Sequence, residues 1–154
     1  STTKEAMWVD SIVGRAFANH SPVALLADAW TTAGAGTEDV LYEAAALAIL
    51  DEISALNSDS LGSTNGVYPN CSGLEARMYA EVVHAVFDQG MTSDEANSII
   101  LKLFEKYKGG FVTPNFGLPF DQVYDTKTVM PKDSWLDLYK KVKEDVASMG
   151  VQFA

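Results

Sequence analysis

The sequence has few of the residues that would point to a disulfide scaffold, a metal site or a membrane protein. Its single cysteine, Cys71, excludes an intramolecular disulfide, and two histidines are too few for a zinc site built by this chain alone. No apolar run approaches the roughly 20 residues that cross a bilayer. The first residues are polar, so the sequence shows no signal peptide. We therefore expect a cytoplasmic protein with no metal and no membrane partner.

Basic residues are also scarce. The 154 residues contain 11 Lys and Arg against 21 Asp and Glu, a net charge of −10, which argues against nucleic acid as a partner. Residues 1–101 hold 3 basic and 14 acidic side chains, whereas residues 102–154 hold 8 and 7. This pattern is typical of a helical tail with mixed, solvated faces, and it also fits a tail that folds over an acidic neighbouring surface.

The first half of the chain has the pattern of an α/β protein. A helix is predicted over about residues 4–18, with Thr2 and Glu5 in capping-box spacing. Its apolar face consists of Trp8, Val9, Ile12, Val13, Ala16 and Phe17. Residues 23–30 are apolar without alternation, which predicts a strand covered on both faces. A glycine-containing loop then leads to a long alanine-rich helix over about residues 37–56, with Thr37 as its N-cap.

The second half is predominantly helical. A weak second strand is predicted over 61–67, and we divide the chain there into barrel units (1–72) and a helical C-terminal part (73–154). Ser72 with Glu75, and Thr92 with Glu95, have the spacing of capping boxes that open two further helices. An extended crossing segment follows, and Pro131 is expected in the first turn of the last helix.

Two parallel strands are too few for a stable sheet. A closed (β/α)8 barrel needs roughly 250 residues and eight strands, and a two-stranded fragment leaves edges and apolar faces open. Either elements outside this chain complete the sheet, or the fold is mainly helical. The first alternative predicts a homo-oligomer in which partner chains cover the face near residues 23–27.

The candidate binding residues lie where the two predicted strands end. Asp28 is an acid near the carboxyl end of an apolar strand, the place where barrel side chains reach substrate. A cap on a nearby loop is an equally weighted alternative for this carboxylate. Trp30 follows it, and Ser63, Thr64 and Asn65 would line the same rim. The loop at residues 33–36 is interpreted as a tight turn, because it lacks the spacing and the lysine of phosphate-binding loops.

Several stretches, in this order and spacing, resemble a known family. They are Thr2-Thr3-Lys4-Glu5, Ala33-Gly34-Ala35-Gly36-Thr37-Glu38, Leu41-Tyr42-Glu43-Ala44-Ala45-Ala46, Gly73-Leu74-Glu75-Ala76-Arg77-Met78 and Tyr124-Asp125-Thr126-Lys127-Thr128-Val129-Met130-Pro131. Across nearly the whole chain they are similar to the C-terminal third of the monomethylamine:corrinoid methyltransferases, the archaeal enzymes that carry pyrrolysine. The resemblance implies the C-terminal portion of a TIM-type (β/α)8 barrel followed by a helical extension.

The resemblance also implies a function. In the family, a methyl group passes from a small methylated amine to the cobalt of a corrinoid carried by a partner protein. The strand that carries pyrrolysine has no counterpart here, so the resemblance assigns no catalytic residue to this chain and implies that it is inactive alone.

At the candidate site the sequence departs from the family. The family's glutamine and tyrosine fall on Asp28 and Trp30, which could enclose a cation by charge and a cation–π contact. The substrate therefore need not be monomethylamine. The alternative function is a non-enzymatic interaction module, which a start codon immediately before Ser1 would support.

Overall fold

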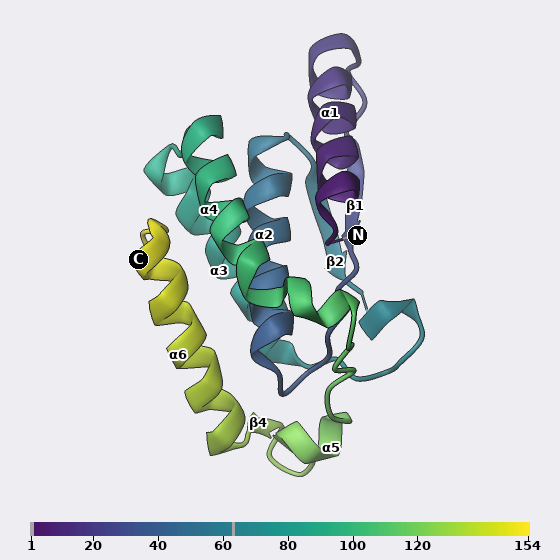
Figure 1. The fold of residues 1–154 in the computed structure, drawn as a ribbon, viewed down its shortest axis with the longest axis vertical. Coiled ribbons are helices and arrows are strands. Elements are labelled where there is room, and N and C mark those ends of the chain that lie inside the picture. Colours follow the sequence, from purple (N-terminus) through teal and green to yellow (C-terminus); the bar gives the residue numbers. More distant parts are fainter. Residues whose placement is uncertain (1, 63) are drawn as a thin grey trace.

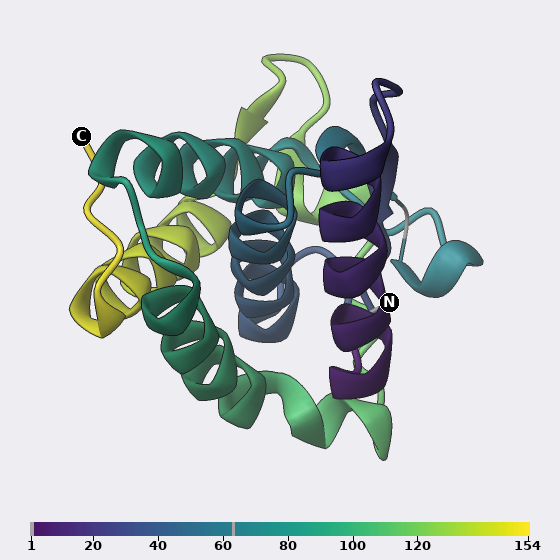
Figure 2. The same ribbon diagram turned by 90° about the horizontal axis from the view of Figure 1, so that it is seen from above.

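The computed structural model describes residues 2–62 and 64–154, in which helices surround one central helix (Figures 1 and 2). In chain order the elements are α1 (Lys4–His20), β1 (Leu26–Ala29), α2 (Glu38–Ile53), β2 (Asn57–Leu61), η1 (Thr64–Gly66), α3 (Gly73–Gln89), α4 (Ser93–Tyr107), η2 (Lys108–Phe111), α5 (Phe120–Val123), β3 (Tyr124–Asp125), β4 (Met130–Pro131) and α6 (Asp133–Met149). In the described part of the chain, no helix combines the length and apolar character needed to cross a bilayer.

The central helix is α2, which is buried around its whole circumference. Figure 2 shows it enclosed by the other helices, and it packs most extensively against α3 and α4. Alanines at 44–46 and 48 have no exposed surface, because side chains this small let the neighbouring helices approach closely. Thr37 caps the helix as expected, since its Oγ1 accepts a hydrogen bond from the Val40 N–H.

The two strands form a parallel pair, but not with the predicted limits. β1 is shorter than the predicted 23–30, and β2 lies at Asn57–Leu61, before the predicted 61–67. The second strand was misplaced because its sequence, Asn-Ser-Asp-Ser-Leu, is polar and lacks a strand pattern. Residues 64–66, predicted as strand, form the 3-10 turn η1 instead.

The prediction that β1 is covered on both faces is wrong. Ala29 is buried, whereas Leu26 and Asp28, on the opposite face, are exposed. An apolar strand without alternation is typical of a sheet covered on both sides. Within residues 2–62 and 64–154 only one side of β1 is covered, so Leu26 on the other side faces outward.

The apolar face of α1 is present but largely uncovered. Only Met7 and Gly14 are buried, while Trp8 is 66% exposed. The predicted face therefore does not point into this chain's core. The N-cap also differs from the prediction: Thr3 caps the helix by accepting from the Ala6 N–H at 3.2 Å, and the Thr2 hydroxyl is engaged elsewhere.

Both later capping boxes are confirmed. Ser72 with Glu75 opens α3, and Thr92 with Glu95 opens α4. Pro131 lies in β4 rather than in the first turn of α6, because the short β3–β4 hairpin pairs it with Tyr124 before the helix starts.

The C-terminal helix lies over acidic side chains of the first two-thirds of the chain. α6 packs on α2 and α3, and Lys143 Nζ lies 2.6 Å from a carboxylate oxygen of Glu81. Partial burial alone would raise the pKa of Glu81, but hydrogen bonds from Lys143, Tyr139 and Arg77 lower it to about 2. The arrangement favours the interpretation of a tail that folds over an acidic surface.

Asp51 is a buried carboxylate in the interface between α2 and α3. It is 3% exposed and accepts a hydrogen bond from the Tyr79 hydroxyl. Burial raises its pKa from 3.8 to about 6, a direction that nearby Asp10 reinforces. Since the folded state holds the proton more tightly than the unfolded chain does, Asp51 favours folding at low pH, and this contribution is lost as the pH rises through about 6.

We expect the Asp51→Asn variant to show this effect directly. The free energy of unfolding of the variant minus that of the wild type should rise by about 2 kcal/mol between pH 4.5 and 7.5, because only the wild type then ionises a buried group. Urea unfolding of both proteins at the two pH values measures this difference. A difference that does not change with pH would contradict the buried, protonated state of Asp51.

Candidate substrate rim at the strand ends

A small hollow lies where β1 and β2 end. It has a volume of about 260 Å³ and is lined by Trp30, Thr31, Thr32, Asn65 and Gly66. Two segments more than 30 residues apart in the sequence therefore meet at one rim. The position agrees with the general rule that ligands of α/β folds bind at the carboxyl ends of parallel strands.

The indole of Trp30 lies directly against glycines of the second segment. A Cβ atom on Gly62 would lie 2.8 Å from Trp30 Cδ2, and one on Gly66 would lie 3.2 Å from Cζ3. Gly66 also has a φ of +66°, which favours glycine. The two glycines thus leave the space in which the indole forms one wall of the hollow.

A backbone hydrogen bond joins the two sides of the rim. The Asn65 N–H donates to the Thr31 carbonyl at 2.7 Å, and Asn65 itself is in the left-handed region, with a φ of 50°. Asparagine adopts this conformation more readily than most residues. The bond fixes Asn65 opposite Thr31 and keeps its side chain at the hollow.

A buried carboxylate holds the first side of the rim in place. Glu43, on α2, accepts hydrogen bonds from the Thr32 N–H at 2.6 Å, the Ala33 N–H at 2.9 Å and the Thr2 hydroxyl at 2.6 Å. Burial raises the pKa of Glu43, although these three donors act to lower it. The loop after β1 is therefore fastened to the central helix at two consecutive amides.

The glycine-containing loop at residues 33–36 is a tight turn, as the sequence predicted. The Gly34 N–H donates to the Asn115 carbonyl at 3.1 Å and the Ala35 N–H to the Asn70 carbonyl at 2.9 Å. A phosphate cradle needs such N–H groups free to bind the anion. Here the protein's own carbonyls occupy them.

The structure brings together only part of the predicted site. Trp30 and Asn65 share the hollow, whereas Asp28 lies two residues earlier on the exposed face of β1 and does not line it. Thr64 is buried, and its hydroxyl donates to the Asn70 carbonyl, so it points into the protein. Ser63 lies outside the described residues.

Sequence reasoning missed Thr31, Thr32, Gly66 and the supporting Glu43. The two threonines directly follow the predicted strand, so its end was a usable signal. The sequence also gave a weaker signal for Glu43, because this residue is an acid within an otherwise apolar, alanine-rich helix segment.

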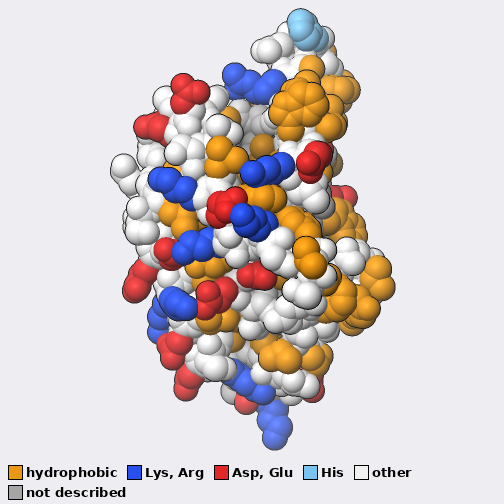
Figure 3. Space-filling model, in the orientation of Figure 1, with side chains coloured by type: hydrophobic (Ala, Val, Ile, Leu, Met, Phe, Trp, Pro, Cys, Tyr) orange, Lys and Arg blue, Asp and Glu red, His pale blue; other side chains and the backbone are white. Residues whose placement is uncertain are grey.

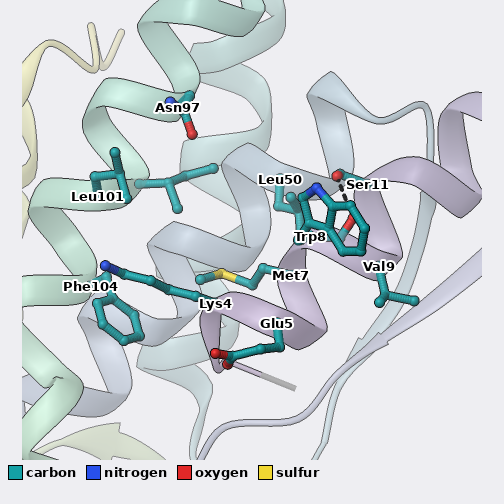
Figure 4. A pocket seen from close by; sticks show the side chains of 11 residues that line it. Lys4, Glu5, Met7, Trp8, Val9, Ser11, Leu50, Asn97, Leu101 and Phe104 are labelled. Carbon is teal, nitrogen blue, oxygen red and sulfur yellow. Dashed lines mark hydrogen bonds between the residues drawn. The ribbon is translucent and has the colours of Figure 1, made fainter.

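A larger hollow lies away from the strand ends, between α1 and α4 (Figure 4). This groove has a volume of about 560 Å³ and a mainly apolar lining that includes Met7, Trp8, Leu50 and Phe104. Lys4 lies over the Phe104 ring at 4.6 Å from its centre. Lys4, Glu5, Ser11 and Asn97 also line this groove, but it lies away from the strand ends where ligands of α/β folds bind, so we place the candidate site at the rim instead.

The chain is similar throughout to one family of known proteins. The family described as monomethylamine methyltransferase MtmB matches residues 1–151. Monomethylamine methyltransferase MtmB2 of Methanosarcina acetivorans is 34% identical over 123 residues, which make up 79% of this chain and 26% of that protein. MtmB of Methanosarcina mazei is 32% identical over the same shares. The chain thus spans about a quarter of the length of these relatives.

Solved structures agree with the sequence comparisons. The crystal structure of the Methanosarcina barkeri monomethylamine methyltransferase MtmB superimposes with a TM-score of 0.88 at 27% identity, covering 94% of this chain and 32% of that one. A second structure, a hydroxylamine complex of MtmB, superimposes with a TM-score of 0.86 at 26% identity. The prediction of a fragment of a TIM-type barrel is thus supported, in a helix-dominated chain with a small sheet.

Proposed function

Because this chain belongs to the monomethylamine methyltransferase MtmB family, we propose that it forms the C-terminal part of an enzyme that takes a methyl group from a methylated amine. The observation that carries the proposal is the match over 151 residues, which includes the rim at the ends of β1 and β2. In this proposal the acceptor is the cobalt of a corrinoid carried by a partner protein. The electrophile that captures the amine belongs to a part of the barrel outside this chain.

The residues of this chain would form one wall of the amine site. A methylated ammonium ion carries a positive charge and small apolar groups. Trp30 offers an aromatic face to such a cation, and Asp28, on the same open side of the strand, offers a negative charge. Thr31, Thr32 and Asn65 supply the polar edge of the hollow. Binding and orientation of the cation are the steps that these residues would perform.

We expect Asp28→Asn to weaken the binding of methylammonium about fivefold, since an exposed charge contact contributes up to about 1 kcal/mol. The measurement is a nuclear magnetic resonance titration of the chain with methylammonium chloride, followed through the indole N–H of Trp30. Asp88→Asn, an exposed acid on α3, is the matched control and should bind as the wild type does. Methanol, a neutral molecule of similar size, should bind both Asp28 forms equally.

Two results would count against this site. One is a Trp30 signal that does not respond to methylammonium at any concentration that leaves the protein folded. The other is an equal response in the wild type and Asp28→Asn, which would favour a role for Asp28 as a loop cap.

A further inference from the structure

Charge alone does not distinguish one small ammonium ion from another at the strand ends. Figure 3 shows hydrophobic side chains along the side of the molecule that α1 and the strands form, whereas charged side chains gather over the helices of the opposite side. The carboxylate of Asp28 and the aromatic face of Trp30 attract a methylated cation whether or not it keeps an N–H group. A group that distinguishes such cations has to accept a hydrogen bond from that N–H.

The hydroxyl group of Thr32, which lines the hollow, is part of a short chain of hydrogen bonds. Its Oγ1 lies 3.4 Å from Oγ1 of Thr2, a long contact in which either group could be the donor. The Thr2 hydroxyl has one proton and lies 2.6 Å from Oε2 of Glu43. Hydrogen bonds to its carboxylate favour the ionised form of Glu43, which can only accept. Thr2 therefore donates to Glu43, and Thr32 donates to Thr2.

This direction decides what Thr32 can offer a ligand. Its O–H donates to Thr2, and its N–H donates to Glu43 at 2.6 Å. Both donors of Thr32 are thus used within the protein, and a ligand in the hollow meets the lone pairs of the hydroxyl oxygen. The preceding hydroxyl has the same direction, because Thr31 donates to the Ala33 carbonyl at 3.0 Å. This side of the hollow accepts hydrogen bonds.

We propose that Thr32 is a specificity-determining residue that accepts a hydrogen bond from an N–H group of the bound cation. Thr2 is the positioning residue that turns the Thr32 hydroxyl toward this role, and Glu43 fixes the direction of Thr2. The inference rests on the proposed function and restricts its substrate. A methylated ammonium ion that keeps an N–H group gains the contact with Thr32, whereas a quaternary ammonium ion has no proton to donate.

The test compares two cations on the whole chain, methylammonium and tetramethylammonium, each titrated as its chloride and followed through the indole N–H of Trp30. Thr32→Val keeps the shape of the side chain and removes the acceptor. We expect it to weaken methylammonium binding about five- to tenfold, the effect of losing a hydrogen bond to a charged group at an open site, and to leave tetramethylammonium binding unchanged. Thr32→Ser should restore most of the methylammonium affinity. Thr126→Val, at an exposed position, is the matched control and should bind both cations as the wild type does.

The role of Thr2 has its own variant. The Tyr107 hydroxyl donates to the Thr2 carbonyl at 3.0 Å, so the backbone of Thr2 should keep its place in Thr2→Val. The freed Thr32 hydroxyl then turns among its staggered positions, and methylammonium binding should weaken about two- to threefold, with tetramethylammonium unaffected. Thr2→Ser should bind methylammonium as the wild type does. Equal methylammonium affinities of Thr2→Val and the wild type would overturn the role of Thr2.

The outcomes separate this inference from the proposed function. A structural role of Thr32 would weaken both cations together in Thr32→Val. If that variant changes both affinities equally, or neither, the inference is overturned while the amine site stands. If the wild type binds neither cation, the amine site itself is wrong, and the role of Thr32 is overturned with it.

Discussion

Replacing Glu43 with alanine should destabilise the protein by about 3–4 kcal/mol. The carboxylate is 1% exposed and accepts hydrogen bonds from Thr2, Thr32 and Ala33, all of which would lose their acceptor. Each buried donor left unpaired costs about 1–3 kcal/mol, and the contributions are not additive because the three donors share one carboxylate. Urea unfolding measures the loss. Glu144→Ala, at an exposed position of α6, is the control and should change stability by less than about 0.5 kcal/mol.

A second change at Glu43, Glu43→Gln, should loosen the rim. Thr32 lines the hollow, and its N–H is one of the two amides that Glu43 fastens to α2. We expect faster amide exchange at Thr32 and Ala33 in Glu43→Gln, which keeps the shape of the side chain but turns one acceptor into a donor. A Glu43→Gln protein with wild-type stability and wild-type exchange at both amides would contradict this role.

The effect on exchange bears on the proposed function. A loop fastened to a buried helix keeps its side chains in place before a ligand arrives, so less ordering is needed on binding. Glu43 touches no ligand in this arrangement. It acts by positioning Thr32, and through the Thr31–Asn65 bond it affects both sides of the hollow.

Local signals in the sequence predicted the helices well. The caps at Thr37, at Ser72 with Glu75 and at Thr92 with Glu95 depend on residues three positions apart, and all are found in the structure. The apolar face of α1 was also read correctly as a periodic pattern. The pattern could not predict whether this face of α1 is buried, because burial depends on which other parts of the molecule pack against it.

The strands and the rim depended on contacts that no local pattern encodes. β2 is polar, and it is a strand because its backbone pairs with β1, not because of its side chains. The sequence predicted that Thr64 lines the rim, but its hydroxyl donates a hydrogen bond to the Asn70 carbonyl and therefore points into the protein. Glu43 contacts loop residues ten and eleven positions away, in a direction that a helical wheel of α2 does not show.

Behind the rim, two loops cross at Gly34 and Gly117. The loop after β1 meets the segment before α5, where the Gly34 N–H donates to Asn115 and the Leu118 N–H donates to the Ala35 carbonyl at 2.8 Å. A Cβ atom on Gly34 would lie 2.0 Å from the carbonyl oxygen of Phe116. The two backbones thus approach more closely than any residue with a side chain would allow.

Gly34→Ala should therefore cost about 3 kcal/mol or more, at the upper end of the range for overpacking, since the atom in the way belongs to the backbone and cannot turn aside. The crossing segment would have to move, and with it the hydrogen bonds of Gly34 and Ala35 that fix the loop behind the rim. The measurement is the free energy of unfolding in urea, together with amide exchange at Leu118. Gly109→Ala is the matched control, because an added Cβ there meets nothing within 4 Å, and it should change stability by less than about 0.5 kcal/mol. If both variants were equally stable, the close crossing of the two loops would not exist in solution, and the rim would have to be held by Glu43 alone.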